Sequence, residues 1–382
     1  LPTEPSRSPM ANFLFCWELG GGLGHTTLFR PFAEALLQRG HRGLVAAREL
    51  PAARQAFAGT EIPFVAAPCK RGQRKNPVRR PRCFAHILHN TGWDDADELA
   101  GRLAAWRHLY DLFEPAAIVC NHSPAALLAA RGYPARRVLL GDGFCNPPPT
   151  SPLPVVRPWV KHDMRRLTKD EEVVTSVVNK ALAQLQVPRV SGLADVYSDA
   201  DNHLLLTYAE LDHFGPREGA TYYGTFNTCA TGEVDWPSAN GPRIFAYLKP
   251  MKGLEELLTA ISDLGCSAVV HGTWASPMLS AGKGFANVML EPSAVDLPAA
   301  AATCDLAILN ATHGSTATFL SAGKPILQIP IVVEQVLTAR NTEKLGASLV
   351  ARNNNLSEIT AQLERMLNTD QFTTAAQTFA KK

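Results

Sequence analysis

His313–Thr318 is the stretch of this chain whose residue types are best suited to bind a phosphate group. It follows an apolar run at 306–309 and opens a helical pattern that leads to a second apolar run at 326–329. Small residues at such a turn let the backbone approach a ligand, and the first amides of the helix present N–H groups to an anion. Glu334 and Gln335 follow the second run, where their side chains can bind sugar hydroxyls. We expect a ligand site here; the alternative is a buried strand–helix–strand unit that binds nothing.

A second candidate site is the glycine-rich turn Gly20–His25, between an apolar run at 13–17 and an amphipathic run at 26–38. Glycine permits positive φ and close backbone approach, and the turn after the first strand is the usual ligand position in a doubly wound sheet. The spacing differs from the Gly-x-Gly-x-x-Gly of dinucleotide sites. His25 can act as a general base, although a single histidine at a helix start is commonly structural or merely exposed.

Strand-like and helix-like stretches alternate along both halves of the chain and must position these two sites. The strand-like runs are continuously apolar, which is typical of parallel sheets covered by helices on both faces. The sequence therefore predicts an α/β protein with two doubly wound, Rossmann-like parallel sheets. The expected strands are 13–17, 44–47, 62–66, 116–120, 138–140, 204–208, 221–223, 243–248, 268–270, 288–290, 306–309, 326–329 and 348–350. The main expected helices are 26–38, 94–113, 124–130, 159–186, 254–264, 334–345 and 357–367.

The length of 382 residues allows two domains, each with its own core. A polar, proline-rich start precedes Met10, which we take as the native first residue. The stretch from Gly224 to Gly241 has little periodicity and is typical of a linker. The expected division is a terminal tail at 1–9, an N-terminal domain at 10–224, a linker at 225–241, a C-terminal domain at 242–367 and a final segment at 368–382.

The composition indicates an ordinary globular protein, with 19% charged and 46% hydrophobic residues and a net charge of +2. No apolar run reaches the roughly 18 residues that span a bilayer, and the start has no signal-peptide pattern. We therefore expect a cytoplasmic protein that does not bind nucleic acid. The eight cysteines are scattered without a Cys-x-x-Cys pair, so neither a disulfide framework nor a zinc site is expected.

Three further groups contain residue types that bind metals. Asp-x-Asp strings occur at 95–97, in the first turn of a predicted helix where acids favour the helix dipole, and at 199–201, in a turn before a predicted strand. His86 and His89 are spaced to share a helix face, but no third ligand accompanies them. We expect no metal site.

With the glycine-rich turn at 20–25 in its first half and the turn at 313–318 in its second, the chain resembles the GT-B glycosyltransferases related to the plant and bacterial UDP-glycosyltransferases (glucosyl- and glucuronosyltransferase-like). The resemblance covers the chain from Met10 onward. It implies a GT-B fold, in which two Rossmann-like domains face each other across a cleft. The N-terminal domain then binds the acceptor, the C-terminal domain binds the nucleotide sugar, and 368–382 crosses back to the N-terminal domain. The implied activity is transfer of a hexose to a small acceptor, with inversion and without a metal or other cofactor. The implied co-substrate is a UDP- or dTDP-sugar, with a UDP-sugar as the first choice.

The resemblance carries over to named donor-site residues. The family's diphosphate-binding side chains match His313 and Thr318, its hexose-binding pair matches Glu334–Gln335, and Gly314–Thr316 would supply backbone donors. Two positions depart from the family: Ala317 replaces a common asparagine and Ser321 replaces the glutamate that bonds the ribose. Lys249, just after the first strand of this half, adds positive charge near the phosphates or is a solvated surface residue.

On the acceptor side, the family's histidine at the first turn deprotonates the acceptor, and that residue is His25 here. An aspartate usually orients this histidine, but Asn121 stands at the matching position. Asp142, after the next strand, and Glu18, at the end of the first strand, are the other candidates; we rank Asp142 first.

Candidate acceptor contacts are Glu18, Gly22, Trp93 and Phe144. The basic stretch 70–82 is either a solvated loop or a contact for an anionic acceptor, an acidic lipid surface or a partner.

Alternatives from other classes remain. A glycosyltransferase for a lipid or cell-envelope acceptor would use the basic loop for peripheral membrane contact. A catalytically inactive sugar-nucleotide-binding protein would explain Asn121 and Ser321. An NAD(P)-dependent oxidoreductase would have two α/β halves, but it would need the Gly-x-Gly-x-x-Gly that is missing here.

Overall fold

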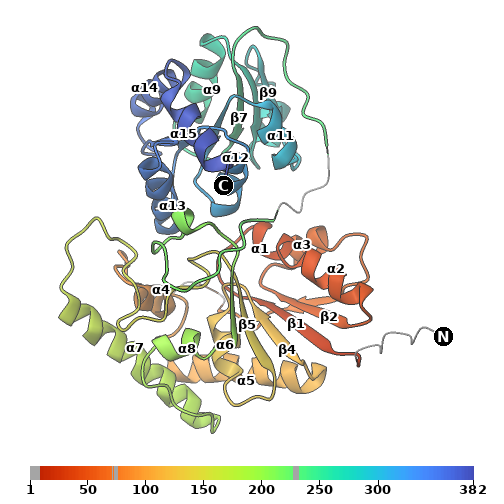
Figure 1. Ribbon diagram of the computed structural model, residues 1–382, viewed down its shortest axis with the longest axis vertical. Coiled ribbons are helices and arrows are strands. Elements are labelled where there is room, and N and C mark those ends of the chain that lie inside the picture. Colours follow the sequence, from red (N-terminus) through yellow and green to blue (C-terminus); the bar gives the residue numbers. More distant parts are fainter. Residues whose placement is uncertain (1–8, 71, 73–75, 227–231) are drawn as a thin grey trace. The chain divides into compact units, whose positions relative to one another are not determined.

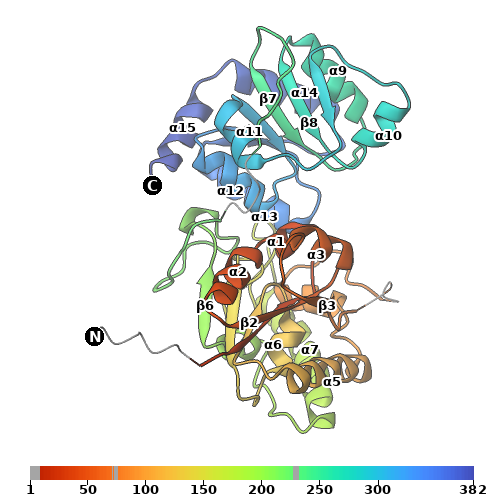
Figure 2. The same ribbon diagram turned by 90° about the vertical axis from the view of Figure 1, so that its right-hand side faces the viewer.

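The computed structural model describes residues 9–70, 72, 76–226 and 232–382, and the chain divides into two compact units (Figures 1 and 2). Unit 1 comprises Leu1–Leu206 and Arg217–Gly224, and unit 2 comprises Thr207–Pro216 and Thr225–Lys382. The tail expected at 1–9 lies outside the described residues except for Pro9. Each unit is a parallel sheet with helices on both faces, as the continuous apolar runs predict.

Unit 1 contains a six-stranded sheet in the order β3-β2-β1-β4-β5-β6, and every pair is parallel. Its strands are β1 (Asn12–Trp17), β2 (Arg42–Ala47), β3 (Phe64–Ala66), β4 (Ala117–Cys120), β5 (Arg136–Gly141) and β6 (Asn202–Leu205). Its helices are α1 (Gly24–Thr27), α2 (Arg30–Gln38), α3 (Leu50–Ala56), α4 (Phe84–Asn90), α5 (Ala96–Phe113), α6 (Pro124–Ala129), α7 (Met164–Gln184) and α8 (Ala194–Ser198). Phe15 and Trp17 pack against α2 and α3 on one face of this sheet.

Unit 2 repeats the architecture with the order β12-β11-β10-β7-β8-β9, again all parallel. Its strands are β7 (Arg243–Tyr247), β8 (Ser267–His271), β9 (Val288–Glu291), β10 (Leu306–Leu309), β11 (Ile326–Gln328) and β12 (Ser348–Val350). Its helices are the 3-10 helix η1 (Ala209–Leu211) and α9 (Leu254–Asp263), α10 (Ala275–Ser280), α11 (Leu297–Thr303), α12 (His313–Ser321), α13 (Val333–Lys344), α14 (Leu356–Leu367) and α15 (Gln371–Ala380). Helices α9, α10 and α14 cover one face, and α11, α12 and α15 cover the other.

Both sheets reverse their strand order at one point, between β1 and β4 in unit 1 and between β7 and β10 in unit 2. Chain connections leave the sheet in opposite directions there, which opens a crevice beyond the carboxyl ends of the two strands, and ligands bind doubly wound sheets at this position. The two turns singled out from the sequence, 20–25 and 313–318, follow β1 and β10 and so lie at these two points.

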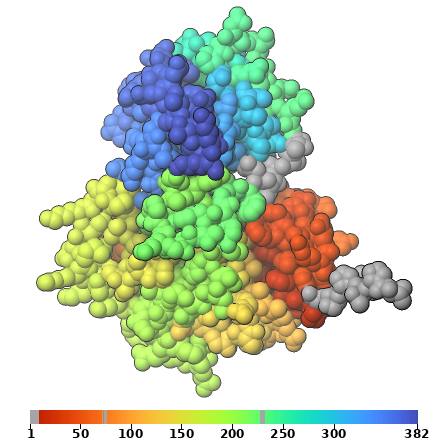
Figure 3. Space-filling model, in the orientation of Figure 1, coloured from red at the N-terminus to blue at the C-terminus, as the bar shows by residue number. Residues whose placement is uncertain are grey.

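The structure differs from the sequence-based expectations at several places, of which three concern the division of the chain and the end of the first sheet. Residues 221–223 form no strand and contribute one isolated bridge, Leu205 to Tyr222. Residues 207–216, expected in the N-terminal domain, belong to unit 2, because Leu211 enters that unit's core. The final segment is α15, dark blue in Figure 3, and it also belongs to unit 2. Its residues Ala376 and Phe379 pack into the same core as Leu211.

Within the described residues, no helix combines the length and the apolar character needed to cross a membrane. The seven described cysteines are free thiols, and Cys229 lies outside the described residues. The Asp-x-Asp string at 95–97 begins α5 as expected, since the Asp95 carboxylate accepts from the amides of Asp97 and Glu98 at 3.0 and 3.1 Å.

Glu18 joins the end of β1 to the start of α6 and is fully buried. Its carboxylate accepts from the first-turn amide of Ala125 at 2.7 Å and from Trp106 Nε1 at 3.3 Å. Burial raises the pKa of this carboxyl from 4.5 to about 7, and the positive charge of Arg102 and the two donors oppose the rise. Glu18 is therefore part of the core, not the acceptor contact expected from the sequence.

This raised pKa predicts a pH-dependent stability. Because folded Glu18 holds its proton more tightly than the unfolded chain does, its contribution to stability is complete below pH 4.5 and is lost as pH rises to about 7. We expect wild type to lose up to about 3 kcal/mol relative to Glu18→Gln across this window, measured by urea unfolding at both ends. A stability difference independent of pH would contradict this prediction.

Candidate functional site

His25 lies at the second position of α1, and its ring orientation is fixed by Asn121 at the end of β4. The Asn121 amide nitrogen donates to the Leu140 carbonyl at 2.8 Å, so its Oδ1 is the atom that faces His25. Oδ1 lies 2.7 Å from His25 Nδ1. Nδ1 must therefore carry the hydrogen, which leaves the lone pair of the neutral ring on Nε2. This is the tautomer that a general base acting through Nε2 requires.

Neighbouring residues hold the imidazole from its other sides. The Trp17 ring stacks on it with centroids 5.1 Å apart and an interplanar angle of 18°. Gly20 has φ of +80°, and a Cβ there would lie 2.6 Å from His25 Nε2. A glycine is thus required at this turn because the backbone runs directly past the nitrogen that bears the lone pair.

Asn121 is placed in turn by a second glycine. Gly141 ends β5 with φ of +147°, and a Cβ there would lie 2.4 Å from Asn121 Nδ2 and 3.1 Å from Cys145 Cβ. The carboxyl ends of β1, β4 and β5 are thereby joined through one amide group that uses both of its polar atoms.

Asp142, which the sequence analysis ranked first as the partner of His25, has a different contact. Its Oδ1 accepts from the amides of Phe144 and Cys145, both at 2.9 Å, and so fixes the turn after β5. Glu18, the third candidate, is fully buried, and its carboxylate accepts from the Ala125 amide in the first turn of α6. The hydrogen bond to His25 is made by Asn121, the residue at the family position.

The candidate acceptor contacts separate into buried and accessible groups. Trp93 is fully buried, so it does not present its ring to a ligand at the surface. Phe144 is 6% exposed and packs edge-on against His122, with centroids 5.8 Å apart. Gly22 is exposed at the turn, with φ of +97° and its amide 3.4 Å from Glu49 Oε2. Of these three residues, only Gly22 lies open to solvent.

Lys70 of the basic stretch and His86 of the two spaced histidines have defined partners. Lys70 pairs with Glu98 on α5. His86 lies 3.0 Å from Asp170 on α7 and accepts from the Arg82 amide at 3.1 Å, so it joins two parts of the fold. Residues 71 and 73–75 lie outside the described residues.

In unit 2, the first turn of α12 offers backbone donors at the end of β10. The first amides of a helix have no partner within it, and the Thr312 side chain does not cap them. Gly314 is exposed and open to approach, whereas Ser315 is nearly buried. Thr316, expected as a third donor, is engaged, since its amide donates to the Thr312 carbonyl at 3.0 Å.

The side chains of α12 that were expected to hold the diphosphate are held by hydrogen bonds of their own. His313 is 5% exposed, and its Nε2 lies 2.7 Å from Thr207 Oγ1. Thr318 Oγ1 donates to the Gly314 carbonyl at 3.0 Å. Ser321, where the family has a glutamate, lies 3.0 Å from the Tyr208 hydroxyl.

Glu334 and Gln335 open α13, but they are not equivalent. The Gln335 amide oxygen accepts from the backbone of Ile331 and Val332 at 2.8 and 3.3 Å, so it secures the start of the helix. Glu334 is partly exposed and lies 3.4 Å from His213 Nε2. Of the expected pair, Glu334 has the more accessible side chain for a ligand.

Lys249 is exposed just after β7, and its backbone is fixed by Asn310. The Asn310 Oδ1 accepts from the Lys249 amide at 2.6 Å, while its Nδ2 donates to the Ile329 carbonyl at 2.8 Å. Asn310 thus ties together the ends of β7, β10 and β11, much as Asn121 does in unit 1.

Three residues of this site were missed from the sequence: Thr207, His213 and Asn310. His213 is buried, bonds Thr338 Oγ1 at 3.0 Å and lies 5.5 Å from the His313 ring. Thr207 and His213 stand 106 and 125 residues before their partners His313 and Thr338, in a stretch without periodicity. Asn310 did have a signal, since a polar residue directly after a buried strand of a parallel sheet lies at the ligand edge.

The whole chain is similar to solved glycosyltransferases. It matches a glycosyltransferase of kitacinnamycin with a TM-score of 0.71 and 15% identity, covering 98% of this chain and 95% of that chain. It matches SsfS6 of Streptomyces sp. SF2575 with a TM-score of 0.65 and 17% identity, covering 97% and 95%. It matches the spinosyn rhamnosyltransferase SpnG with a TM-score of 0.64 and 16% identity, covering 97% and 95%.

SsfS6 and SpnG have also been solved with thymidine diphosphate, and SpnG with the spinosyn aglycone. The structural similarity to these glycosyltransferases extends over both units of this chain. It confirms the expected GT-B fold with its two Rossmann-like domains. The sequence matches no family model and no curated protein.

Gly141 provides a direct test of the geometry around Asn121. We expect Gly141→Ala to destabilise the protein by about 2 kcal/mol or more, because alanine is strained at this φ and its Cβ meets Asn121. Gly192→Ala is the matched control, since no atom lies within 4 Å of the position that its Cβ would take and its φ is not positive. Urea unfolding measures both; equal stabilities of the two variants would show that the backbone at Gly141 is not constrained as described.

Proposed function

We propose that this protein is a glycosyltransferase that moves a hexose from a nucleoside diphosphate sugar to a hydroxyl group of a small acceptor, with inversion and with His25 as general base. The observation that carries the proposal is the hydrogen bond between His25 Nδ1 and Asn121 Oδ1, which leaves the Nε2 lone pair at the switch point of unit 1. A site for the diphosphate at the switch point of unit 2 supports it, as does the similarity to solved glycosyltransferases.

The proposed reaction is a single displacement. Nε2 of His25 takes the proton of the acceptor hydroxyl while that oxygen attacks the anomeric carbon. The bond from this carbon to the diphosphate oxygen breaks, and its electron pair leaves with the nucleoside diphosphate. Attack opposite the leaving group inverts the anomeric configuration. The imidazolium formed at His25 keeps its Nδ1–H on the Asn121 oxygen, whose carbonyl dipole favours the positive ring.

The negative charge that grows on the leaving diphosphate requires donors in unit 2. The amides of Gly314 and Ser315, the positive end of α12 and His313 supply them without requiring a metal ion. His313 is anchored by Thr207, so its ring is held in place before the donor arrives. Glu334, steadied by His213, would accept hydrogen bonds from hexose hydroxyls, and Lys249 would add positive charge.

A catalytically inactive sugar-nucleotide-binding protein is the second candidate. The specific observation in its favour is Asn121, because a neutral amide stabilises an imidazolium less than a carboxylate does. The donor site would be unchanged in that case, and only transfer would be lacking.

The donor site is tested by a thermal-shift titration with UDP, dTDP, GDP, ADP and NAD(P). We expect UDP or dTDP to stabilise the protein by about 2.7 kcal/mol at 100 times its dissociation constant. Gly314→Pro removes one first-turn amide donor of α12 and should weaken this effect. Stabilisation by NAD(P) alone would refute the glycosyltransferase proposal in favour of an oxidoreductase.

The general base is tested with His25→Ala. We expect the variant to bind the nucleotide like wild type but to lose about 10²- to 10⁴-fold in transfer rate, since a general base contributes on that order. Asn121→Ala should lower the rate less, because the imidazole remains but its tautomer is no longer fixed. Full activity of His25→Ala would refute the mechanism, and nucleotide binding without transfer by wild type across an acceptor panel would favour the inactive binder.

A further inference from the structure

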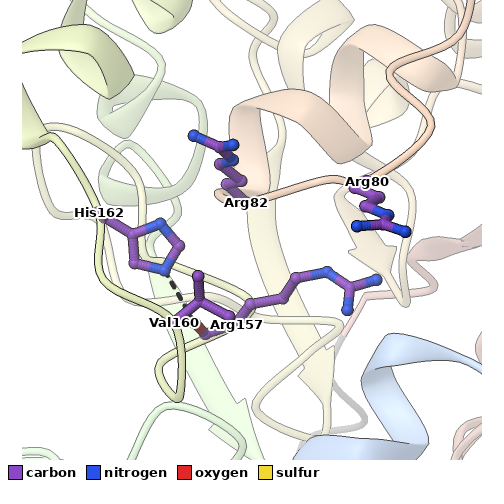
Figure 4. Close-up of a pocket in the computed structure, with 5 residues that line it drawn as sticks. All are labelled: Arg80, Arg82, Arg157, Val160 and His162. Carbon is purple, nitrogen blue, oxygen red and sulfur yellow. Dashed lines mark hydrogen bonds between the residues drawn. The ribbon is translucent and has the colours of Figure 1, made fainter.

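Arg80, Arg82, Arg157, Val160 and His162 of unit 1 line a hollow of about 240 Å³ (Figure 4). We call this feature the arginine hollow. Its residues come from the end of the basic stretch and from the segment before α7, which lie far apart in the sequence. By the volume of liquid water, it holds on the order of eight water molecules, enough for a carboxylate or phosphate group and part of its carrier.

The two segments that form the arginine hollow are held against each other by backbone hydrogen bonds. The Phe84 amide donates to the Pro154 carbonyl at 2.9 Å, and the Val156 amide donates to the Arg82 carbonyl at 2.8 Å. Arg157 Nε donates to the Pro81 carbonyl at 3.0 Å. The backbone that carries the positive side chains is therefore preformed, and the Arg157 side chain is anchored to it.

Two of the three guanidinium groups, those of Arg80 and Arg157, extend toward each other, whereas the Arg82 side chain points away from them (Figure 4). Among the described residues, none of them forms an ion pair with a carboxylate, whereas Arg131 and Arg137 of the same unit both pair with Asp199. Like charges gathered around one hollow repel each other, and an anion bound between them relieves that repulsion. Guanidinium groups also match the planar, two-oxygen geometry of carboxylates and phosphates.

His162 adds a polar atom at the wall of the arginine hollow. Its Nε2 donates to the Arg157 carbonyl at 2.8 Å, as Figure 4 shows. Its Nδ1 is shielded from solvent and has no hydrogen-bond partner among the described residues. Because Nε2 donates, Nδ1 of the neutral ring is an acceptor, so a hydroxyl or another donor of a bound ligand would satisfy it, and an anionic oxygen would not.

A continuous series of packed rings connects the arginine hollow to His25 within unit 1. The His25 ring lies 6.0 Å from His122, His122 lies 5.8 Å from Phe144, and Phe144 lies 5.4 Å from Phe84. Phe84 begins α4 two residues after Arg82. His25 and the arginine hollow thus belong to one unit, and the ring series links His25 to Phe84, which follows the lining residue Arg82 by two positions.

We propose that the arginine hollow is a subsite for an anionic group, a carboxylate or phosphate, carried by the acceptor at the end remote from its reacting hydroxyl. This inference rests on the proposed function, which assigns His25 to the acceptor, and it deepens that function by naming the acceptor class. The acceptor is then an extended hydroxyl compound with an acidic group.

The test compares Arg80→Gln/Arg82→Gln with wild type. Both side chains are exposed and make no hydrogen bonds of their own among the described residues, so the fold should survive. The matched control is Arg54→Gln/Arg189→Gln, which removes the same charge from two exposed arginines of unit 1 outside the arginine hollow. The probes are para-hydroxybenzoate, para-hydroxycinnamate and a hydroxybiphenyl carboxylate, each with its methyl ester, together with inorganic phosphate.

Binding is measured by calorimetry without donor, so that it does not depend on sugar transfer. We expect at least one acid to bind wild type and the control at least tenfold more tightly than its ester. We expect Arg80→Gln/Arg82→Gln to lose this preference, and raising the salt from about 0.05 M to about 0.5 M to reduce it in wild type. The same preference should appear in kcat/KM once a donor has been identified.

Three results would overturn the inference. Acids that bind no better than esters, or equally well to the double variant, would show that the arginine hollow is a solvated surface. Arginine-dependent binding of inorganic phosphate that no hydroxyaryl acid displaces would assign it to a free anion. Arginine-dependent binding only to vesicles of phosphatidylserine would assign it to a membrane. Because binding is measured without donor, absence of transfer together with selective acid binding would count against the proposed function and leave this inference standing.

Discussion

The arrangement at the first switch point depends on one amide group, the side chain of Asn121. Its nitrogen is committed to the Leu140 carbonyl, so its oxygen has only one orientation available toward His25. Gly141 leaves room for that nitrogen, and Gly20 leaves room for the opposite side of the imidazole. A carboxylate would orient the ring by its charge as well as by a hydrogen bond, whereas the amide orients it by the hydrogen bond alone. The neutral partner therefore makes the site more dependent on backbone placement.

Unit 2 uses a similar solution with different residues. Asn310 holds the ends of three strands through its two polar atoms, and the buried pair Thr207 and His213 supports the two side chains nearest the expected ligand, His313 and Glu334. Asn310 and Thr207 are neutral, and His213 carries a charge only when it is protonated. The proposed donor site is consequently supported from below by buried groups, Thr207, His213 and Asn310, around which water competes little for hydrogen bonds.

The sequence predicted what depends on local pattern. Continuous apolar runs predicted both sheets, and small residues after β1 and β10 predicted the turns at 20–25 and 313–318. It failed where a side chain's role depends on its surroundings in three dimensions. Nothing in the local pattern shows that the Asp142 carboxyl caps its own turn, or that Trp93 is buried. The contacts of Thr207 were invisible for a related reason, because a pattern of single residues does not encode pairing across about 100 positions.

The assignment of Thr207–Pro216 to unit 2 has a consequence for how this chain could be divided. The chain passes between the units at three peptide positions, after residues 206, 216 and 224, instead of once. Neither unit is then a continuous piece of sequence. A single cut in the expected linker would leave the second half without η1 and the buried His213, and would leave that segment attached to the first half. Exchange of halves between relatives would therefore preserve both sheets and still separate the proposed donor site from His213, one of the residues that support it.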